Sequence, residues 1–338
     1  MPAISVVIPS YNHAAYIGQA VQSVLDQSFD DWELIIIDDG SQDESLRVLS
    51  TYRDSRIQVH TQDNQGAHAA LNKGLSLATG DYLAILNSDD VYTRKRLQKL
   101  FHRLETDNTI AIAGSYIQVI NASGFNLGLK RGYHSLEPWL LDQPELSFRA
   151  STDLKLALLT ENYLSTSSNY MFRRELFAHV DGFRPLRFAH DWDFALRAMQ
   201  EGNIYLEQEP LLKYRIHGHN TINKSKPEMI FEMCWCLAVH LPGYYARIAE
   251  CDGATTAGIV QGLLYSVYTY HADKVLSIML VQNLAGQPQA ALDLLHPKNE
   301  TRRKYLDYLN TMCLQQPAHT QSTIFGKFKS YISTLLHL

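Results

Sequence analysis

Residues 34–41 read Leu-Ile-Ile-Ile-Asp-Asp-Gly-Ser, an apolar run that ends in two carboxylates. Residues 82–90 follow the same plan, with Tyr-Leu-Ala-Ile-Leu before Asn-Ser-Asp-Asp. Short apolar runs bounded by turn residues are typical of buried strands. Carboxylates at buried positions are costly unless a cation or hydrogen-bond donors meet them. Ligands of open α/β sheets bind beyond the carboxyl ends of the strands. The two segments therefore predict a site for a nucleotide and a divalent cation at one sheet edge.

Strand and helix patterns alternate on both sides of these runs, as far as residue 104. Asn12 is expected to be the N-cap of the first helix, because its short polar side chain precedes a stretch with helical apolar spacing. We expect strands at 4–8, 34–37, 57–60 and 82–86, and helices at 14–27, 41–49 and 66–78. The alternation predicts an α/β fold with a mostly parallel central sheet flanked by helices. Residues 1–104 would form its nucleotide-binding half.

The pattern changes after residue 104. Residues 105–226 mix strands and helices and would form a second half laid against the first. We expect strands at 111–120, 124–129, 168–172, 204–206 and 211–216, and helices at 150–160, 174–179 and 191–200. Residues 227–338 carry apolar residues at helical spacing in 228–249, 257–285 and 301–313. This stretch is therefore predicted to be a helical C-terminal region.

The composition is that of an ordinary globular protein. The chain has 338 residues, of which 46% are hydrophobic and 19% charged. A formal net charge of −5 gives no basic field for a nucleic-acid partner. No C-x-x-C pair occurs, so the cysteines are interpreted as reduced thiols of a cytoplasmic protein; they are Cys234, Cys236, Cys251 and Cys313. Neither a signal peptide nor a membrane-spanning segment is expected from the sequence.

The last stretch, residues 321–338, differs from the rest of the chain. It holds no acidic residue, and its apolar residues fall on one face of a helix. Such an amphipathic helix can lie in a membrane interface or can pack on the protein's own core. Both alternatives stay open at this point, so peripheral contact with the inner face of the cell membrane remains one of them.

The order of the motifs is more specific than any one of them. Val-Val-Ile-Pro-Ser-Tyr-Asn at 6–12 is followed by Asp-Asp-Gly-Ser at 38–41, Asn-Gln-Gly at 64–66 and Asn-Ser-Asp-Asp at 87–90. Gly-Phe-Arg at 182–184 and His-Asp-Trp-Asp at 190–193 complete the series. This succession resembles the family-2 glycosyltransferases, inverting enzymes of the GT-A fold, over residues 3–222. The resemblance implies a glycosyltransferase domain over residues 1–226.

The resemblance also implies the chemistry. The donor would be a nucleotide-diphosphate sugar, most often a UDP-sugar, and the acceptor a hydroxyl of a glycan or lipid-linked glycan. Such a hexosyltransferase would serve the synthesis of cell-envelope polysaccharide and would use Mn²⁺ or Mg²⁺. The implied nucleotide-binding residues are Pro9, Tyr11, Asn12, Asp39, Asn64, Gly66 and Ser88. Asp89 occupies the metal-binding position of the Asp-x-Asp motif, and His217 would be a further metal ligand.

The acceptor side follows from the same resemblance. Transfer with inversion needs one base to take the proton of the attacking hydroxyl, and Asp191 matches the base of the family. On spacing alone, Asp191 could equally be the N-cap of a helix. The remaining sugar and acceptor contacts would come from Asp90, Trp192, Asp193 and Arg215, with Asp193 as the second candidate for the base.

Two departures from the family pattern leave an alternative open. Asn87 stands where an Asp is more usual, and Leu71 stands where many members have Arg. A catalytically degenerate nucleotide-sugar-binding protein is the first alternative, and a nucleotidyltransferase is the second. No G-x-G-x-x-G follows the first strand, which weighs against a dinucleotide-dependent oxidoreductase.

Overall fold

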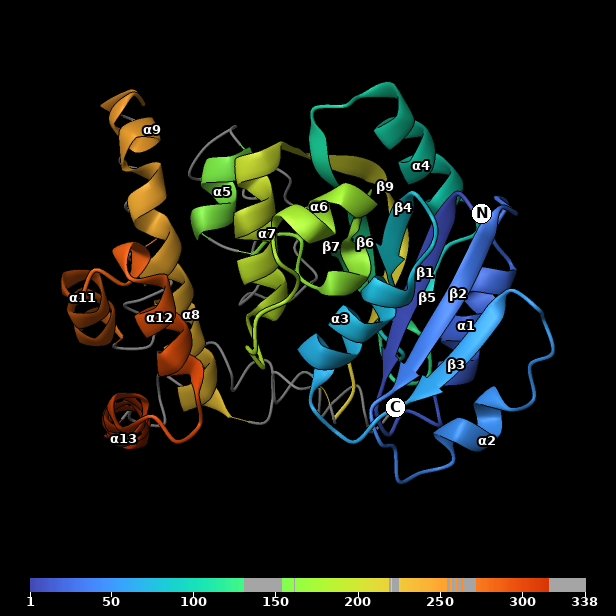
Figure 1. Cartoon of the computed structure of the whole chain (residues 1–338), viewed down its shortest axis with the longest axis horizontal. Helices are drawn as coiled ribbons and strands as arrows, with labels where there is room; N and C mark the ends of the chain where they lie inside the picture. The colour runs from blue at the N-terminus through green and yellow to red at the C-terminus, as the bar shows by residue number, and fades with distance from the viewer. Residues whose placement is uncertain are drawn as a thin grey trace.

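The computed structural model describes residues 1–130, 154–160, 162–218, 220, 225–253 and 272–315, together with 256, 259 and 263. Figure 1 shows two groups of elements. The sheet and its helices lie on the right of that view, and the helices of the C-terminal region lie on the left.

Four parallel strands form the N-terminal half of the sheet. They are β1 (Ile4–Ser10), β2 (Trp32–Asp38), β3 (Ile57–Thr61) and β4 (Tyr82–Ile85), in the order β3-β2-β1-β4. The crossovers are α1 (Ile17–Leu25), α2 (Ser45–Leu49) and α3 (Ala67–Leu77). Because β1 and β2 are buried on both faces, apolar residues fill consecutive positions, at 6–8 and 34–37, instead of alternating.

The two faces of this part of the sheet pack into two separate hydrophobic cores. Val7 and Ile35 pack with Leu71 of α3 in one core, whereas Ile8 and Leu34 pack with residues of α1 in the other. Successive strand residues point to opposite faces, so each strand contributes to both cores. The prediction of helices on both faces of the sheet is confirmed.

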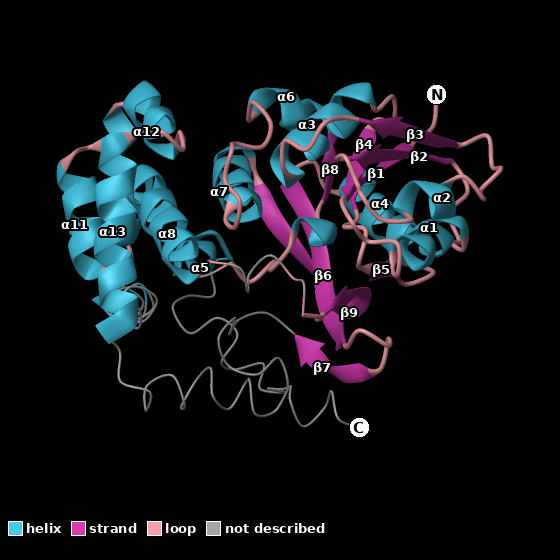
Figure 2. Ribbon diagram, turned by 90° about the horizontal axis from the view of Figure 1, so that it is seen from below, coloured by secondary structure: helices cyan, strands magenta, loops and turns pink. Residues whose placement is uncertain are grey.

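The remaining strands make the sheet a mixed one, as Figure 2 shows. β8 (Met171–Arg173) lies antiparallel between β4 and β6 (Ile110–Ile120), and β9 (Asn203–Arg215) runs parallel to β6. β5 (Val91–Tyr92) and β7 (Asn126–Lys130) add antiparallel partners to β9 and β6. The helices of this half are α4 (Arg96–Thr106), α5 (Leu154–Thr160), α6 (Arg174–His179) and α7 (His190–Glu201). The parallel pairing expected from the sequence thus occurs among the first four strands and again between β6 and β9.

Three local predictions are wrong. Asn12 is not an N-cap, because α1 begins at Ile17 and Asn12 has a left-handed φ of 54° in the loop before it. The two strands expected at 204–206 and 211–216 are one strand, β9, which ends at Arg215 and whose register with β6 shifts near Tyr116 instead of breaking. The segment Ser167–Asn169 is a short 3-10 helix, so the strand expected from residue 168 begins only at Met171.

The described part of the C-terminal region is helical, as predicted. It comprises α8 (Lys226–His240), α9 (Tyr245–Ala249), α11 (Asp273–Val281), α12 (Pro288–Leu295) and α13 (Glu300–Gln315), with short 3-10 turns at Leu241–Tyr244 and Leu284–Gly286. The turn containing Pro242 divides the helix expected at 228–249, because proline interrupts helical hydrogen bonding. The sequence did not predict α12. Most of 257–271 and the amphipathic segment 321–338 lie outside the described residues.

The C-terminal helices share a core with the sheet domain. Phe231 and Trp235 of α8 belong to the same buried cluster as Phe194 and Leu196 of α7. Across the described ranges, every helix falls short of the length and apolarity needed to cross a membrane.

Candidate active site

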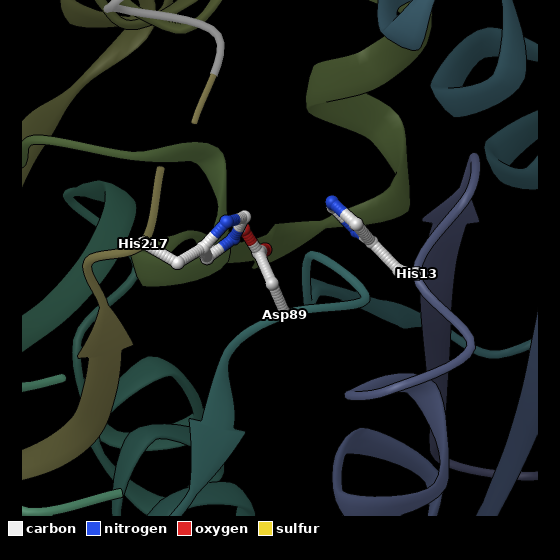
Figure 3. Close-up of side chains that lie close together, drawn as sticks. All are labelled: His13, Asp89 and His217. Carbon is white, nitrogen blue, oxygen red and sulfur yellow. The ribbon is translucent and has the colours of Figure 1, made fainter. Parts of the chain in front are cut away.

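The loops after β4 and β9 bring Asp89 and His217 together. The Nε2 atom of His217 lies 3.0 Å from Oδ2 of Asp89 (Figure 3). The backbone N–H of His217 donates to Oδ1 of Asn220, and the Asn220 amide donates to the carbonyl of Arg215 at 3.1 Å. These two bonds hold the loop that presents the imidazole. The predicted metal ligands Asp89 and His217 are therefore neighbours.

His13 joins this pair from the loop after β1. Its ring lies edge-on to that of His217, with centroids 5.6 Å apart, and its Nδ1 lies 2.7 Å from Oγ of Ser88. One potential ligand atom from each of His13, Asp89 and His217 lies within 4.8 Å of the other two. The sequence analysis did not single out His13. Its position in a loop at the carboxyl end of a parallel strand was the signal that could have found it.

The donor atoms around Asp89 suit a cation. Burial works to raise the pKa of Asp89, but its hydrogen bond with His217 and its electrostatic interactions with His13 and His217 lower that pKa below its ordinary value. A carboxylate with two imidazoles is a donor set that fits Mn²⁺ and other first-row divalent ions. Mg²⁺ prefers oxygen ligands and retains water. The donor atoms present thus fit a divalent metal, with better chemistry for Mn²⁺ than for Mg²⁺.

Asp90 and Arg215 form the frame of this loop. Oδ2 of Asp90 accepts from Ser168 at 2.6 Å, and Oδ1 accepts from the backbone N–H of Arg215 at 2.9 Å. Burial and the neighbouring Asp89 charge raise the pKa of Asp90 well above its ordinary value. The Arg215 guanidinium donates to the carbonyl of Asp89 at 2.8 Å and to Gln19 at 2.7 Å. Asp90 and Arg215, both predicted to contact the sugar or acceptor, thus form hydrogen bonds that hold the loop carrying Asp89.

The loops after β1, β2 and β3 meet at the predicted nucleotide-binding residues. The two carboxylate oxygens of Asp39 accept from the backbone N–H groups of Gln65 at 2.9 Å and Gly66 at 2.8 Å. Gly66 has a φ of 92°, a conformation that favours glycine, directly before α3. Asn12 links the first two loops, since its Oδ1 accepts from the backbone of Gln42 at 2.7 Å.

The other predicted nucleotide contacts differ in exposure. Tyr11 is 42% exposed and Asn64 is also exposed, so both face solvent beside these loops. Pro9 is buried within β1 opposite Ile37. Ser88 is buried against His13. The structure therefore brings the predicted loops together, with Pro9 and Ser88 inside the scaffold.

Asp191 lies in the first turn of α7, where it is buried. The N-cap of α7 is Ala189, so the alternative in which Asp191 caps the helix is wrong. Burial raises the pKa of Asp191 to about 7, although hydrogen bonds from the Trp192 backbone and the Asn162 side chain, and the charge of Lys130, oppose that rise. A carboxyl with this pKa can hold or release a proton near neutral pH.

The neighbours of Asp191 have structural contacts. The indole of Trp192 is buried and donates to the carbonyl of Leu158 at 2.7 Å. Asp193 is fully buried and pairs with Arg184 at 3.0 Å and Arg197 at 2.7 Å. Burial alone would raise the pKa of Asp193, but its charged partners hold it well below its ordinary value. Both residues, expected at the acceptor, lie instead within the packed interior.

Tyr214 connects the two acidic positions. Burial raises the pKa of its phenol, and the charges of Asp90, Asp89 and Asp191 raise it further. The phenol of Tyr214 is thus sensitive to the charge of all three carboxyl groups. Neither Tyr214 nor Lys130 was predicted to lie near the site, because Tyr214 falls inside an expected strand and nothing in the local pattern around residue 130 marks a site.

Comparisons with known proteins show which family the sequence matches. The family model described as Glycosyl transferase family 2 matches residues 5–181. An uncharacterized glycosyltransferase of Rickettsia typhi is 27% identical over 237 residues, which are 69% of this chain and 70% of that protein. The putative teichuronic acid biosynthesis glycosyltransferase TuaG of Bacillus subtilis is 46% identical over 101 residues, which are 29% of this chain and 40% of TuaG.

Solved structures show the same fold. S. aureus TarS 1-349 in complex with UDP-GlcNAc aligns over 91% of this chain and 90% of that chain, with a TM-score of 0.57 and 18% identity. A Pyrobaculum calidifontis mannosyltransferase in complex with GDP-Man and Mn²⁺ aligns over 93% of this chain and 86% of that chain, with a TM-score of 0.52 and 16% identity. The predicted GT-A fold is confirmed.

Proposed function

This chain belongs to glycosyl transferase family 2, and we propose that it transfers a sugar with inversion from a UDP-sugar to a hydroxyl of a glycan or lipid-linked glycan. The observation that carries the proposal is the contrast between two acidic residues near Tyr214. The pKa of Asp89 is lowered beside two imidazoles, whereas burial raises the pKa of Asp191 to about 7. When the pKa values of two carboxyl groups in one site are shifted in opposite directions, one group commonly has an electrostatic role and the other an acid–base role.

Asp191 is the proposed general base. A base is most effective when its pKa lies near the working pH, because it is then both ionised and basic enough to take a proton. The carboxylate would accept the proton of the acceptor hydroxyl as that oxygen bonds to the anomeric carbon. The bond between the anomeric carbon and the diphosphate oxygen breaks from the opposite face, and the nucleotide diphosphate leaves with the electron pair. This displacement inverts the anomeric configuration.

Asp89, His217 and His13 are the proposed holders of a divalent cation. When bound, such a cation neutralises the charge of a diphosphate leaving group. The protein's part is to present one carboxylate and two imidazole nitrogens from three separate loops. Asn87, the departure from the family pattern, accepts from Ser167 at 3.1 Å and donates to Thr166 at 3.0 Å. Its amide therefore braces the loop, and His13 and His217 supply the additional donors.

The choice of UDP rests on likeness. Similar solved structures hold UDP and UDP-GlcNAc, although another holds GDP-Man. The name of TuaG, a relative over part of the chain, refers to teichuronic acid biosynthesis and supports a glycan acceptor. Asp39, fixed by the backbone N–H groups that precede α3, is the proposed contact to the nucleoside.

A nucleotide screen followed by product analysis tests the proposal. Thermal melting with UDP, GDP, dTDP and CMP, each with and without Mn²⁺, should show the largest rise with UDP and Mn²⁺ together. A panel of UDP-sugars is then incubated with cell-envelope lipid and glycan extracts, and the linkage is assigned by NMR. An α-linked donor should give a β-linked product. A product that keeps the donor's configuration would exclude Asp191 as the base of a single displacement.

A further inference from the structure

Glu232 of α8 makes an unusual set of contacts with the sheet domain. Its side chain is almost fully buried at 2% exposure. Oε1 accepts from the backbone N–H of Arg187 at 2.9 Å, and Oε2 accepts from those of Phe188 at 2.7 Å and Ala189 at 3.0 Å. One carboxylate from the C-terminal region thus binds three consecutive N–H groups of a loop about 45 residues earlier in the chain.

That loop is the entry to α7. Ala189 is the N-cap of α7 and has no side-chain oxygen to cap the helix. The first N–H groups of a helix lack partners within it and carry partial positive charge, so a carboxylate placed there is favourable. Glu232 binds the N–H of the N-cap Ala189 and those of the two residues before it, so its carboxylate lies at this end of the helix. Asp191 follows only two residues after the last N–H group that Glu232 binds.

A second contact from α8 lies on the other side of Asp191. Nε2 of His240 lies 2.9 Å from Oδ1 of Asp193. Asp193 also pairs with Arg184 and Arg197, so the same carboxylate joins α8, α7 and the loop after α6. In Figure 2, α8 and α7 lie in neighbouring positions, and their residues are in contact. Asp191 is therefore flanked in sequence by two residues, Ala189 and Asp193, that are each bound to the same C-terminal helix.

We propose that α8 positions the base: Glu232 fixes the loop before α7, His240 fixes Asp193, and together they set the location of the Asp191 carboxylate. The inference rests on the proposed role of Asp191, and it assigns the C-terminal region a function in turnover in addition to its share of the core. Glu232 and His240 are positioning residues, since both act through the backbone or side chains next to Asp191.

The size of the effect follows from geometry. Without the Glu232 carboxylate, three N–H groups lose charge-assisted hydrogen bonds, and the loop must move to find water or other acceptors. A displacement of about 1 Å at a reacting group can cost roughly 100-fold in rate. Glutamine keeps one acceptor oxygen but turns an amide NH₂ group toward one of the loop N–H groups. We therefore expect kcat to fall less for Glu232→Gln than for Glu232→Ala.

The test compares Glu232→Gln, Glu232→Ala and His240→Gln with the matched control Glu228→Gln. Glu228 lies one turn earlier on α8 and pairs with the side chain of Arg187 at 3.2 Å, so its loss leaves the loop backbone bound. Activity is UDP release from UDP-GlcNAc, or from the UDP-sugar that turns over fastest in the screen above, with Mn²⁺ present. We expect kcat to fall about 10-fold for Glu232→Gln and about 100-fold for Glu232→Ala. The donor KM should change less than about twofold, because the nucleotide loops are untouched.

Hydrogen exchange gives an independent readout. The amides of residues 187–189 should exchange faster in the Glu232 variants and at the wild-type rate in Glu228→Gln. If exchange rises but kcat is unchanged at temperatures far below melting, Glu232 is purely structural and the inference is overturned. The same holds if Glu228→Gln loses as much kcat as Glu232→Gln.

One further variant separates this inference from the proposed function. Asp191→Asn, assayed alongside, should nearly abolish turnover. If Asp191→Asn is inactive and Glu232→Gln keeps its full kcat, the positioning role fails and the base assignment stands. If Asp191→Asn remains active, the base assignment fails, and the positioning role of α8 fails with it.

Discussion

Replacing Asp191 by Asn should make the protein more stable at pH 8 while removing its activity. Burial raises the pKa of Asp191 from its ordinary 3.8 to about 7, which means that the folded protein pays to keep this carboxylate ionised. This difference between the pKa values of the folded and unfolded states lowers the free energy of unfolding by about 4 kcal/mol at pH values above 7. Asparagine is neutral, so it escapes this cost. The new amide would face the amide of Asn162 and would bond to it less well than the carboxylate does. We therefore expect a net gain in the free energy of unfolding of about 2 kcal/mol.

The gain should depend on pH with a definite sign. Below about pH 4, the carboxyl group is protonated in both the folded and the unfolded protein, so the variant has little advantage. Between pH 4 and 7 the unfolded chain releases the proton while the folded protein retains it, and wild-type stability falls relative to the variant. Above about pH 7 both states are ionised, and the gain reaches its plateau. The same ionisation predicts that wild-type activity falls about tenfold per pH unit below 7.

The assay is thermal and urea unfolding of both proteins from pH 4 to pH 8, with UDP release as the measure of activity. Saturating Mn²⁺ at each pH keeps metal loss from contributing to the activity profile. Asp193→Asn is the control in the same helical turn. It removes a carboxylate whose pKa is lowered by Arg184, Arg197 and His240, and should cost about 3–5 kcal/mol. Two results would contradict the prediction. One is that Asp191→Asn is less stable than the wild type at pH 8. The other is that wild-type activity begins to fall only near pH 4 as the pH is lowered.

Three other substitutions and one control, Gly243→Ala, test the metal site and the packing of the sheet. Asp89→Ala should remove the Mn²⁺-dependent part of UDP affinity in calorimetry, and a residual dependence equal to wild type would exclude Asp89 as the ligand. His217→Ala should weaken Mn²⁺ binding by at least about 10-fold in electron paramagnetic resonance, because losing even a group that only supports a metal ligand costs that much. Gly74→Ala places a Cβ 2.4 Å from Cγ1 of Val7 and should cost about 1–3 kcal/mol, whereas Gly243→Ala, with nothing within 4 Å, should be neutral.

Much of the fold could be predicted because the N-terminal half follows local rules. Continuous apolar runs such as 34–37 specify strands buried on both faces, and the turn residues after them mark the carboxyl edge. The break at Pro242 was also visible in the sequence as a proline within a helical pattern. By contrast, the pairing of β9 with β6 joins segments about 90 residues apart, so its register depends on contacts that local patterns do not encode.

The candidate site was predicted in part for a similar reason. Asp89, His217 and Asp191 lie in motifs that order and spacing make recognisable. Whether a polar side chain near such a motif faces the site or the core depends on its tertiary partners. Asp193 carries the same chemistry as Asp191 two residues away, yet two guanidinium groups and an imidazole hold it in the interior. His13 lies in the loop after β1, the strand beside β4, so its place at the carboxyl edge was readable from the sequence, whereas its contact with Ser88 depends on tertiary packing.

The most direct test of the account is a crystal structure with a UDP-sugar and Mn²⁺, with the metal located by its anomalous scattering. The account predicts an anomalous peak bonded to Asp89 and His217, with the Asp191 carboxylate facing the anomeric carbon from the side opposite the diphosphate. A metal peak away from Asp89, or a sugar whose anomeric carbon lies out of reach of Asp191, would contradict it.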